Sequence, residues 1–357
     1  MTDRWRAPGR VNLIGDHTDY CEGFVLPIAI DRECVVAASP RSDRRLRARS
    51  AELDGAVDVS SDGDDAPEAI DPAWGRFVAG AVQALTERGA RVPGLDLAIT
   101  STVPVGSGLS SSSALSVALT LALAGAAEYA LDARDAARAA LDAEVRATGV
   151  PGGIMDQLTA LLAVPEHALL IDCRELAVEP IPLPPELLVV VVHSGLARTL
   201  AGSEYAQRRA ACEAAAARLG LRALRDATIQ QAREDPVARH VVTENARVLE
   251  FAAALRAGDV EALGPLLLAS HASLRDDYRV STPQLDLLVE LLVDAGALGA
   301  RLTGAGFGGC VVALCSRAGA DGVLSTVMGQ YRAGTELEPG GFVVRAGRRA
   351  GRVDQSA

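Results

Sequence analysis

The chain has 357 residues, which is enough for about two domains that each bury a core of their own. An apolar fraction of 49% with 23% charged residues is typical of a folded globular protein and excludes global disorder. The net charge of −11 makes nucleic acid and anionic membranes poor partners. All 35 basic residues are arginine, so lysine-dependent phosphate loops and Schiff-base chemistry are excluded.

The cysteines and the N-terminus indicate the compartment. The six cysteines form no Cys-x-x-Cys pair, and we expect them to be reduced thiols that lie mostly in the core. The N-terminus lacks the apolar segment of a signal peptide, and the apolar run near 114–127 is too short and too polar to span a bilayer. We therefore predict a cytoplasmic protein.

The first half is predicted to begin with strands at "RVNLIG", "FVLPIAI" and "ECVVAAS". An exposed hairpin and an acidic loop are expected over 41–72, and helical periodicity follows over about 74–88. The segment "LDLAITSTVP" is typical of a strand that leads into a serine-rich loop. Alanine-rich helices are then expected at about 114–130 and 133–148.

The second half begins after a proline-rich stretch, "ELAVEPIPLPPE", which lies between the predicted buried strands "ALLIDC" and "LLVVVVHS". Three helical regions follow, then predicted strands at "GARLTGAGFGGCVVALC" and "GFVVRAG", and finally "AGRRAGRVDQSA", which we expect to be a loose tail. Helices and strands alternate without a parallel-sheet rhythm, so the pattern favours an α+β fold in two lobes. We place the crossing between the lobes near residue 180.

The segment "VPVGSGLSSSSAL" places two glycines and a run of serines directly before an apolar helix. Gly106 and Gly108 allow backbone conformations that turn successive N–H groups toward a ligand, and the positive end of the helix points to the same place. The alternative is a plain turn with a capped helix, which a single serine would satisfy. We interpret the segment as a phosphate-binding loop formed by Gly106, Ser107, Gly108, Leu109, Ser110, Ser111, Ser112 and Ser113.

A second glycine cluster, "GAGFGG", contains Gly304, Gly306, Gly308 and Gly309. Three of these glycines match the G-x-G-x-x-G dinucleotide fingerprint, which requires a following helix and an acidic residue about 20 positions later. The residues that follow, "CVVALC", are instead typical of a strand, and the acidic residue does not occur at that spacing. We therefore predict a tight turn between two strands, which is also compatible with a ligand lying close to the backbone.

Two further stretches carry candidate polar chemistry. Asp16, His17 and Asp19 directly follow a predicted strand, and this mixture of acceptors and an imidazole suits a ligand with several hydroxyl groups. A metal site or an ordinary polar turn are the alternatives. Asp156 stands in the first turn of a predicted helix, where the helix dipole favours a carboxylate in any case. The two glycines upstream, Gly152 and Gly153, would let a ligand approach that carboxylate closely.

Taken together, six motifs resemble the GHMP small-molecule kinase superfamily and, within it, the galactokinase family. They are "GRVNLIGDHTDY", "PVGSGLSSSSAL", "GGIMDQ", "SEYAQRR", "SLRDDYRVSTPQLDLLVE" and "TGAGFGGC", in family order along the chain. The resemblance implies a two-lobed α+β fold, with an N-terminal mixed α/β lobe at 1–180 and a C-terminal ferredoxin-like α+β lobe at 181–357. The active site is then expected in the cleft between the lobes.

The resemblance also implies a role for each motif. Asp156 matches the catalytic aspartate, which takes the proton of the anomeric hydroxyl while that oxygen attacks the γ-phosphate of ATP, and Arg10 matches the arginine that pairs with it. Ser112 and Glu144 match the positions that bind Mg²⁺. Sugar contacts are implied for Asp16, His17, Asp19, Gly153 and Tyr205. The implied reaction is the ATP- and Mg²⁺-dependent conversion of D-galactose to α-D-galactose 1-phosphate and ADP.

Three positions depart from the usual galactokinase pattern. Asp16 stands where glutamate is usual, Gly152 where cysteine is frequent, and Cys21 where asparagine is commoner. N-acetylgalactosamine kinases of the superfamily tend to have glycine at the position of Gly152. A kinase for another sugar, such as N-acetylgalactosamine or arabinose, is therefore an alternative, and a non-catalytic galactose and ATP sensor is a second one. The adenine contacts are the least defined, because Trp74 and Phe77 could equally belong to the core.

Overall fold

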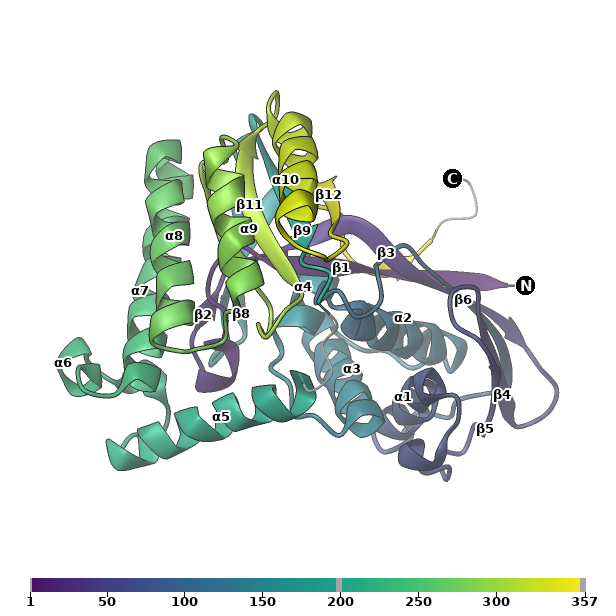
Figure 1. Ribbon diagram of the computed structural model, residues 1–357. Helices are drawn as coiled ribbons and strands as arrows, with labels where there is room; N and C mark the ends of the chain where they lie inside the picture. Colours follow the sequence, from purple (N-terminus) through teal and green to yellow (C-terminus); the bar gives the residue numbers. More distant parts are fainter. Residues whose placement is uncertain (1, 197–200, 354–357) are drawn as a thin grey trace.

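The computed structural model describes residues 2–196 and 201–353, and Figure 1 shows the arrangement of its elements. The strands are β1 (Asp3–Asn12), β2 (Phe24–Val25), β3 (Pro27–Pro40), β4 (Arg45–Ser50), β5 (Ala56–Ser60), β6 (Leu95–Ser101), β7 (His167–Asp172), β8 (Ala177–Pro182), β9 (Leu187–His193), β10 (Gly299–Thr303), β11 (Cys310–Ser316), β12 (Gly340–Val344) and β13 (Gly351–Arg352). The α-helices are α1 (Arg76–Thr86), α2 (Ser111–Ala126), α3 (Ala133–Thr148), α4 (Met155–Leu162), α5 (Ala201–Arg218), α6 (Ile229–Ala232), α7 (Pro236–Ala257), α8 (Val260–Asp276), α9 (Pro283–Asp294) and α10 (Ala320–Gly334).

The largest sheet has the strand order β13-β1-β3-β6-β4-β5. Its neighbouring strands are antiparallel except for β4 and β6, which run parallel. Along β6, Leu95, Leu97 and Ile99 are buried and alternate with exposed residues, because successive side chains of a strand point to opposite faces. The same face of the sheet packs against α2 through β1 and β3, and α1 and α3 complete this layer (Figure 1).

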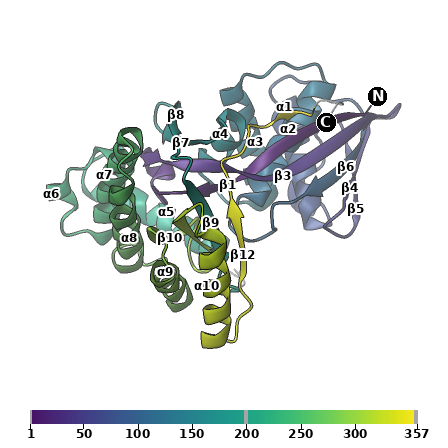
Figure 2. The ribbon, with the colours of Figure 1, turned by 90° about the horizontal axis from the view of Figure 1, so that it is seen from above.

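The second lobe is built on an antiparallel sheet with the order β10-β11-β9-β12. Strand β11 is buried along almost its whole length, because α9 and α10 pack on one face while the side chains of its other face join the core that contains the first lobe. Figure 2 shows α7, α8 and α9 gathered at the end of the molecule opposite β4, β5 and β6. A small sheet has the order β2-β7-β8 and contacts both β3 of the first lobe and α7 of the second.

Side-chain caps define where several helices begin. Asp132 accepts a hydrogen bond from the Asp135 N–H at the start of α3, and Asp235 and Asp259 do the same for α7 and α8. Each such cap satisfies an N–H group that has no partner within its own helix. The aspartate before each of these helices therefore defines where that helix begins.

The two-lobed α+β organisation confirms the predicted fold class, and the described cysteines are buried, as expected. The separate strands predicted at "FVLPIAI" and "ECVVAAS" are wrong, because β3 runs without a break from Pro27 to Pro40. The three helical regions predicted before "GARLT" are five α-helices, α5 to α9. The prediction of a loose tail is wrong at Gly351 and Arg352. These two residues form β13, which pairs with Arg6 and Trp5 of β1. The last four residues of that tail lie outside the described residues. The crossing near residue 180 stays a prediction, and β8 passes through this position. Within the described part of the chain, no helix has the length and apolar character needed to cross a membrane.

Candidate active site

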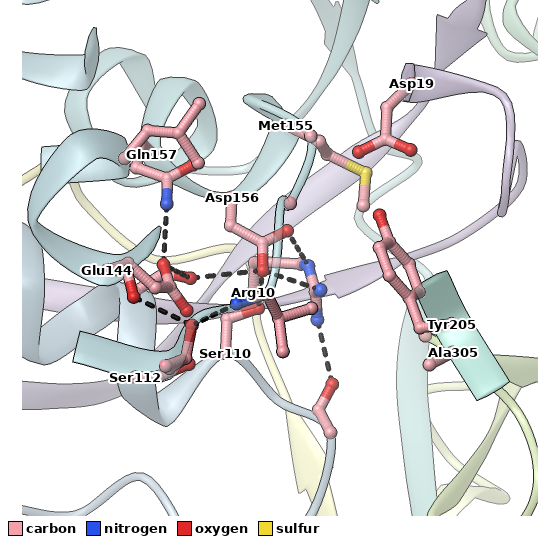
Figure 3. A pocket seen from close by; sticks show the side chains of 18 of the residues that line it. Arg10, Asp19, Ser110, Ser112, Glu144, Met155, Asp156, Gln157, Tyr205 and Ala305 are labelled. Atoms are coloured by element: carbon pink, nitrogen blue, oxygen red, sulfur yellow. Dashed lines mark hydrogen bonds and ion pairs between the residues drawn. The ribbon is translucent and has the colours of Figure 1, made fainter. Parts of the chain in front are cut away.

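One cavity of about 420 Å³ gathers the predicted motifs from distant parts of the sequence. The first lobe contributes Arg10 at the end of β1, the loop before α2, and the beginning of α4. Tyr205 of α5 and the turn at Gly304 and Ala305 close it from the second lobe. Figure 3 shows Arg10 and Asp156 in the middle of the view, with Ser112 and Glu144 on one side and Asp19 and Tyr205 on the other.

Arg10 and Asp156 form a two-point ion pair at the centre of this cavity. The Nε of Arg10 donates to Oδ1 of Asp156 at 2.7 Å, and its second terminal nitrogen donates to Oδ2 at 2.8 Å. The remaining nitrogen of Arg10 donates to the carbonyl oxygen of Gly108 at 2.8 Å, which ties the loop to the same group. Ser110 Oγ donates to Asp156 Oδ2 at 2.5 Å. Because arginine presents its donors in a rigid fork, the orientation of the Asp156 carboxylate is fixed.

The loop before α2 has the backbone that its glycines predict. Gly106 and Gly108 have φ values of +72° and +84°, and Ser110 also lies in the left-handed region with φ of +61°. The Leu109 carbonyl accepts a hydrogen bond from the Arg10 N–H at 3.1 Å, so the loop is anchored on β1. Because α2 begins at Ser111, the loop residues lie at its positively charged end, the usual place for a bound anion.

The serines of this loop divide into two groups that the sequence did not distinguish. Ser107 Oγ donates to the Pro104 carbonyl at 2.8 Å, and Ser110 and Ser113 are also bonded within the protein. Ser110 to Ser113 all line the cavity, but Ser110 and Ser113 are buried, whereas Ser111 and Ser112 are half-buried. Ser107 and Leu109 are buried supports of the loop, whereas the backbone of Gly106 and Gly108 and these two serines face the open space.

Glu144 of α3 adds a carboxylate beside the loop. Its Oε2 accepts hydrogen bonds from Ser113 Oγ at 2.8 Å and from Gln157 Nε2 at 2.7 Å, and its side chain is also hydrogen-bonded to Ser112. Burial raises the pKa of Glu144 above its ordinary value, although these serine bonds oppose that shift. Gln157, which orients Glu144, was missed by sequence reasoning, and its place directly after Asp156 was the one available signal.

The predicted metal ligands, Ser112 and Glu144, thus lie together and present oxygen atoms only. Oxygen ligands are those that Mg²⁺ prefers. No group of three or more histidine, cysteine, aspartate and glutamate side chains that could hold a metal occurs in the part of the chain that the structure describes. A metal at this place would therefore need ligands from bound phosphate or water in addition to these two side chains.

The other side of the cavity carries the predicted sugar contacts. A Cβ atom at Gly153 would lie only 1.7 Å from Oδ2 of Asp19, so this position needs glycine for the carboxylate to occupy its place. Burial and the nearby charge of Asp156 raise the pKa of Asp19 to about 6. His17 Nδ1 is hydrogen-bonded to the Tyr20 hydroxyl at 2.7 Å. The centroids of the His17 and Tyr205 rings are 5.9 Å apart. Burial lowers the pKa of His17 to about 3, so its imidazole is neutral at neutral pH.

Asp16 lies in the wall of the cavity where the two lobes meet. Its Oδ1 accepts a hydrogen bond from the Gly304 N–H at 3.1 Å, and its Oδ2 lies 2.7 Å from a terminal nitrogen of Arg301. Burial raises the pKa of Asp16, although the charge of Arg301 opposes that shift. Arg301 was missed by sequence reasoning, although a single charged residue within the apolar strand "GARLT" is a signal that could have identified it.

The glycine cluster forms the turn between β10 and β11, which confirms the predicted tight turn and contradicts a dinucleotide fingerprint. Gly304, Gly306, Gly308 and Gly309 all have positive φ. A Cβ atom at Gly306 would lie 2.3 Å from the carbonyl oxygen of Val280. This turn brings the Gly304 N–H to Asp16, so its function at the site is to support the second-lobe wall of the cavity.

A second, more apolar cavity of about 560 Å³ adjoins the serine loop. Trp74 and Phe77 line it, together with Leu53 and Val105, and it shares Gly106, Ser111, Ser112 and Thr148 with the first cavity. Trp74 is largely buried, and its Nε1 donates to the Asp54 carbonyl at 2.9 Å. The two cavities therefore meet at the loop, with polar groups on one side of the serines and an apolar surface on the other.

Comparisons with known proteins agree with this geometry. The chain matches the galactokinase galactose-binding signature at residues 3–40, the GHMP kinase N-terminal domain at 76–163 and the GHMP kinase C-terminal domain at 251–332. It is 46% identical to a galactokinase of Roseiflexus sp. (strain RS-1), over 99% of this chain and 93% of that protein. The crystal structure of Lactococcus lactis galactokinase complexed with galactose superposes with a TM-score of 0.92 at 29% identity, covering 99% of this chain and 95% of that one. The mevalonate kinase of Methanococcus jannaschii shares the fold, with a TM-score of 0.70 at 18% identity, covering 97% and 98% of the two chains.

Proposed function

Because the chain belongs to the galactokinase family of GHMP kinases, we propose that it transfers the γ-phosphoryl group of ATP to the anomeric hydroxyl of D-galactose. The products are α-D-galactose 1-phosphate and ADP. The main support for the roles proposed for the site residues is the ion pair of Arg10 and Asp156, which forms two hydrogen bonds in the middle of the cavity. It lies between a loop suited to phosphate and a group of side chains suited to hydroxyls (Figure 3).

Asp156 acts on the attacking hydroxyl in this proposal. Its carboxylate accepts the hydrogen bond of the anomeric hydroxyl and takes that proton as the oxygen forms its bond to the γ-phosphorus. The bond between the γ-phosphorus and the bridging oxygen breaks, and that oxygen leaves with ADP. Arg10 keeps Asp156 charged and oriented, and its positive charge also stabilises the phosphoryl group during transfer. Catalysis is thus positioning and electrostatics, without a covalent intermediate on the protein.

The serine loop and Glu144 hold the nucleotide phosphates and their metal. The backbone N–H groups of the loop and the start of α2 bind phosphate oxygens. Ser112 and Glu144 fit Mg²⁺, because both present oxygen atoms at the loop and Gln157 and Ser113 already orient the carboxylate. Mg²⁺ bound there would neutralise charge on the phosphates. Trp74 and Phe77 supply an apolar cavity next to the loop for the adenine ring.

Asp16, His17, Asp19, Gly153 and Tyr205 form the sugar site in this proposal. Asp19 and Tyr205 face the cavity from opposite lobes, and Gly153 leaves the space that Asp19 occupies. We further propose lobes at 1–180 and 181–357 and a monomer in the cytoplasm. The buried cysteine thiols support a reducing compartment.

A second candidate substrate is a galactose that carries a substituent at C2, such as N-acetylgalactosamine. Gly152 lines the cavity, and a Cβ atom there would meet only Leu141 Cδ1, at 3.7 Å. The cavity is therefore open beside Gly152, whereas a Cβ atom at the neighbouring Gly153 would collide with Asp19. This space is the structural reason to include such a sugar in the first assay.

The test is an ATP-consumption assay with Mg²⁺ across galactose, N-acetylgalactosamine, galactosamine, arabinose and glucose. Galactose is expected to give the highest kcat/KM, and Asp156→Ala is expected to abolish turnover while the protein stays folded. Asp142→Asn is the control, because Asp142 is an exposed carboxylate of α3 that is paired with Arg88 away from the cavity. Normal turnover by Asp156→Ala would contradict the assigned role. Binding of ATP and galactose without turnover by the wild type would instead favour a sensor.

A further inference from the structure

Arg301 is a charged side chain with no access to solvent, held in the second lobe at the back of the sugar side of the cavity. Its side chain is 0% exposed, and its terminal nitrogen lies 2.7 Å from Asp16 Oδ2. The same nitrogen donates to the carbonyl oxygens of Leu13 at 3.2 Å and Asn12 at 3.4 Å. Arg301 therefore binds both the side chain of Asp16 and the backbone that leads to it.

Four charges of alternating sign connect the cavity wall to the outside of α7. Asp16 is paired with Arg301, and a carboxylate oxygen of Glu244 lies 3.8 Å from the other terminal nitrogen of Arg301. Arg247 is the last member, and its Nε donates to Glu244 at 2.8 Å. The Arg247 side chain at the outer end is 14% exposed, whereas that of Glu244 is 0% exposed. The two positive and two negative charges balance, so the chain of side chains can stay ionised inside the protein.

This arrangement also fixes the loop that carries the predicted sugar contacts. Glu244 accepts a hydrogen bond from the Gly15 N–H at 3.0 Å and from Ser270 Oγ at 2.5 Å. His240 Nε2 is hydrogen-bonded to the Asp16 carbonyl oxygen at 3.2 Å. The segment before Asp19 is thus held by side chains of the second lobe, although it belongs to the first.

Stability alone does not explain so many buried charges. Replacing buried ion pairs by apolar residues of similar volume is often neutral or stabilising, because taking charges out of water costs as much as their attraction returns. In addition, Nε and one terminal nitrogen of Arg301 have no hydrogen-bond partner among the described residues. A buried arginine with unused donors is an expensive way to join two lobes, unless the place of the Asp16 carboxylate itself matters.

We propose that Arg301 is a positioning residue for sugar discrimination, which acts by holding the Asp16 carboxylate against the cavity wall. Through it, the second lobe determines which hydroxyl of the bound sugar Asp16 recognises. The inference rests on the proposed sugar kinase function and goes beyond it, because it places a specificity determinant outside the residues that contact the sugar. Arg301 touches neither sugar nor nucleotide in this account.

The experiment measures kcat and KM for wild type, Arg301→Met and Arg301→Lys with galactose, 2-deoxygalactose, 6-deoxygalactose and glucose. We expect the preference for galactose over one of these analogues to fall by about tenfold or more, as for the loss of one charged hydrogen bond. The KM for ATP is expected to stay within about twofold of the wild-type value. Arg301→Lys keeps the positive charge, and we expect it to retain part of the discrimination.

Arg239→Met is the matched control, because Arg239 also forms an ion pair within the second lobe. Its Nε donates to Oδ1 of Asp277 at 3.1 Å, and Arg239 lines neither of the two cavities. An equal loss of kcat/KM for all four sugars in both Arg301 variants would show a structural role only and would overturn the inference. The same would follow if Arg239→Met changed the ratios equally. A wild type that phosphorylates none of the sugars would contradict the proposed function instead. If Arg301→Met does not fold, Arg301→Lys provides the same comparison.

Discussion

Two arginine–aspartate pairs lie at the cavity, one within the first lobe and one between the lobes, and they differ in burial. Arg10 pairs with Asp156 inside the first lobe, and their side chains are 9% and 18% exposed. Asp16, only six positions after Arg10, pairs instead with Arg301 across the lobes, and these side chains are 3% and 0% exposed. The first pair is surrounded by hydroxyls and open space, whereas in the second pair Arg301 is enclosed by protein and only Asp16 reaches the cavity wall.

The comparison shows that burial decides what such a pair can do. A pair at the edge of a cavity can exchange hydrogen bonds with a ligand and can stabilise charge that develops during a reaction. In the second, sealed pair Arg301 has no such freedom, and breaking the pair leaves an uncompensated buried charge. We therefore expect the first pair to affect turnover and the second to affect stability and the place of Asp16.

The largest expected effect is on turnover at the open pair. Arg10→Met removes the cation beside Asp156 and the transferring phosphoryl group, so we expect kcat to fall by about a thousandfold, as for the loss of one preorganised electrostatic contact. Single-turnover transfer from ATP to galactose measures this effect. Arg88→Met, which removes the surface partner of Asp142, serves as the control. A decrease of less than about tenfold in Arg10→Met would remove the functional difference between the pairs.

The sealed pair should show the larger loss of stability. Arg301→Met leaves Asp16 and Glu244 without their shared counter-ion, and we expect the free energy of unfolding to fall by about 3–5 kcal/mol. Arg239→Met, at a pair whose side chains are 36% and 20% exposed, should cost about 1 kcal/mol or less. Urea unfolding of both variants gives the comparison. Equal losses would mean that burial does not separate these two sites.

Two adjacent glycines test how tightly the sugar side is built. In Gly153→Ala the new methyl group would lie 1.7 Å from Oδ2 of Asp19, so the carboxylate must move, and we expect the KM for galactose to rise by about tenfold. In Gly152→Ala the nearest atom is Leu141 Cδ1 at 3.7 Å, so the change in KM should be much smaller. Steady-state kinetics at saturating ATP measure the KM for galactose of both variants. Similar KM values for both variants would argue against Asp19 as a sugar contact.

The smallest expected effect is a pH dependence at Asp19. Burial and the charge of Asp156 raise the pKa of Asp19 from 3.8 to about 6 in the folded protein. Its protonation therefore stabilises the fold fully below pH 3.8, and this contribution is lost as the pH rises through about 6. Asp19→Asn is always neutral, so its advantage in unfolding free energy over the wild type should grow by about 1 kcal/mol between pH 5 and pH 7.5. Urea unfolding at both pH values measures it, with Asp142→Asn as the control, and a constant difference would exclude the raised pKa.

The sequence allowed most of the elements to be predicted, because their signals are local. The alternation along "LDLAITS" defines one face of β6, and the glycines at 106 and 108 adopt the positive φ that their loop requires. The start of α2 was expected about three residues too late, since the serines of its first turn are read equally well as loop. The pairing of Gly351 with β1 could not be predicted, because a two-residue strand has no periodicity of its own.

The residues of the candidate site could be predicted where they belong to a local sequence motif. They could not be predicted where a side chain is paired with a residue far away in the sequence. The sequence by itself determined that the protein has a glycine- and serine-rich loop without lysine, a carboxylate at the start of a helix and a polar cluster after the first strand, because these depend on neighbours in the chain. Only the tertiary structure decided which carboxylate meets which arginine. Asp16 lies six residues from Arg10, yet it is paired with Arg301, because contacts between residues hundreds of positions apart depend on how the lobes pack.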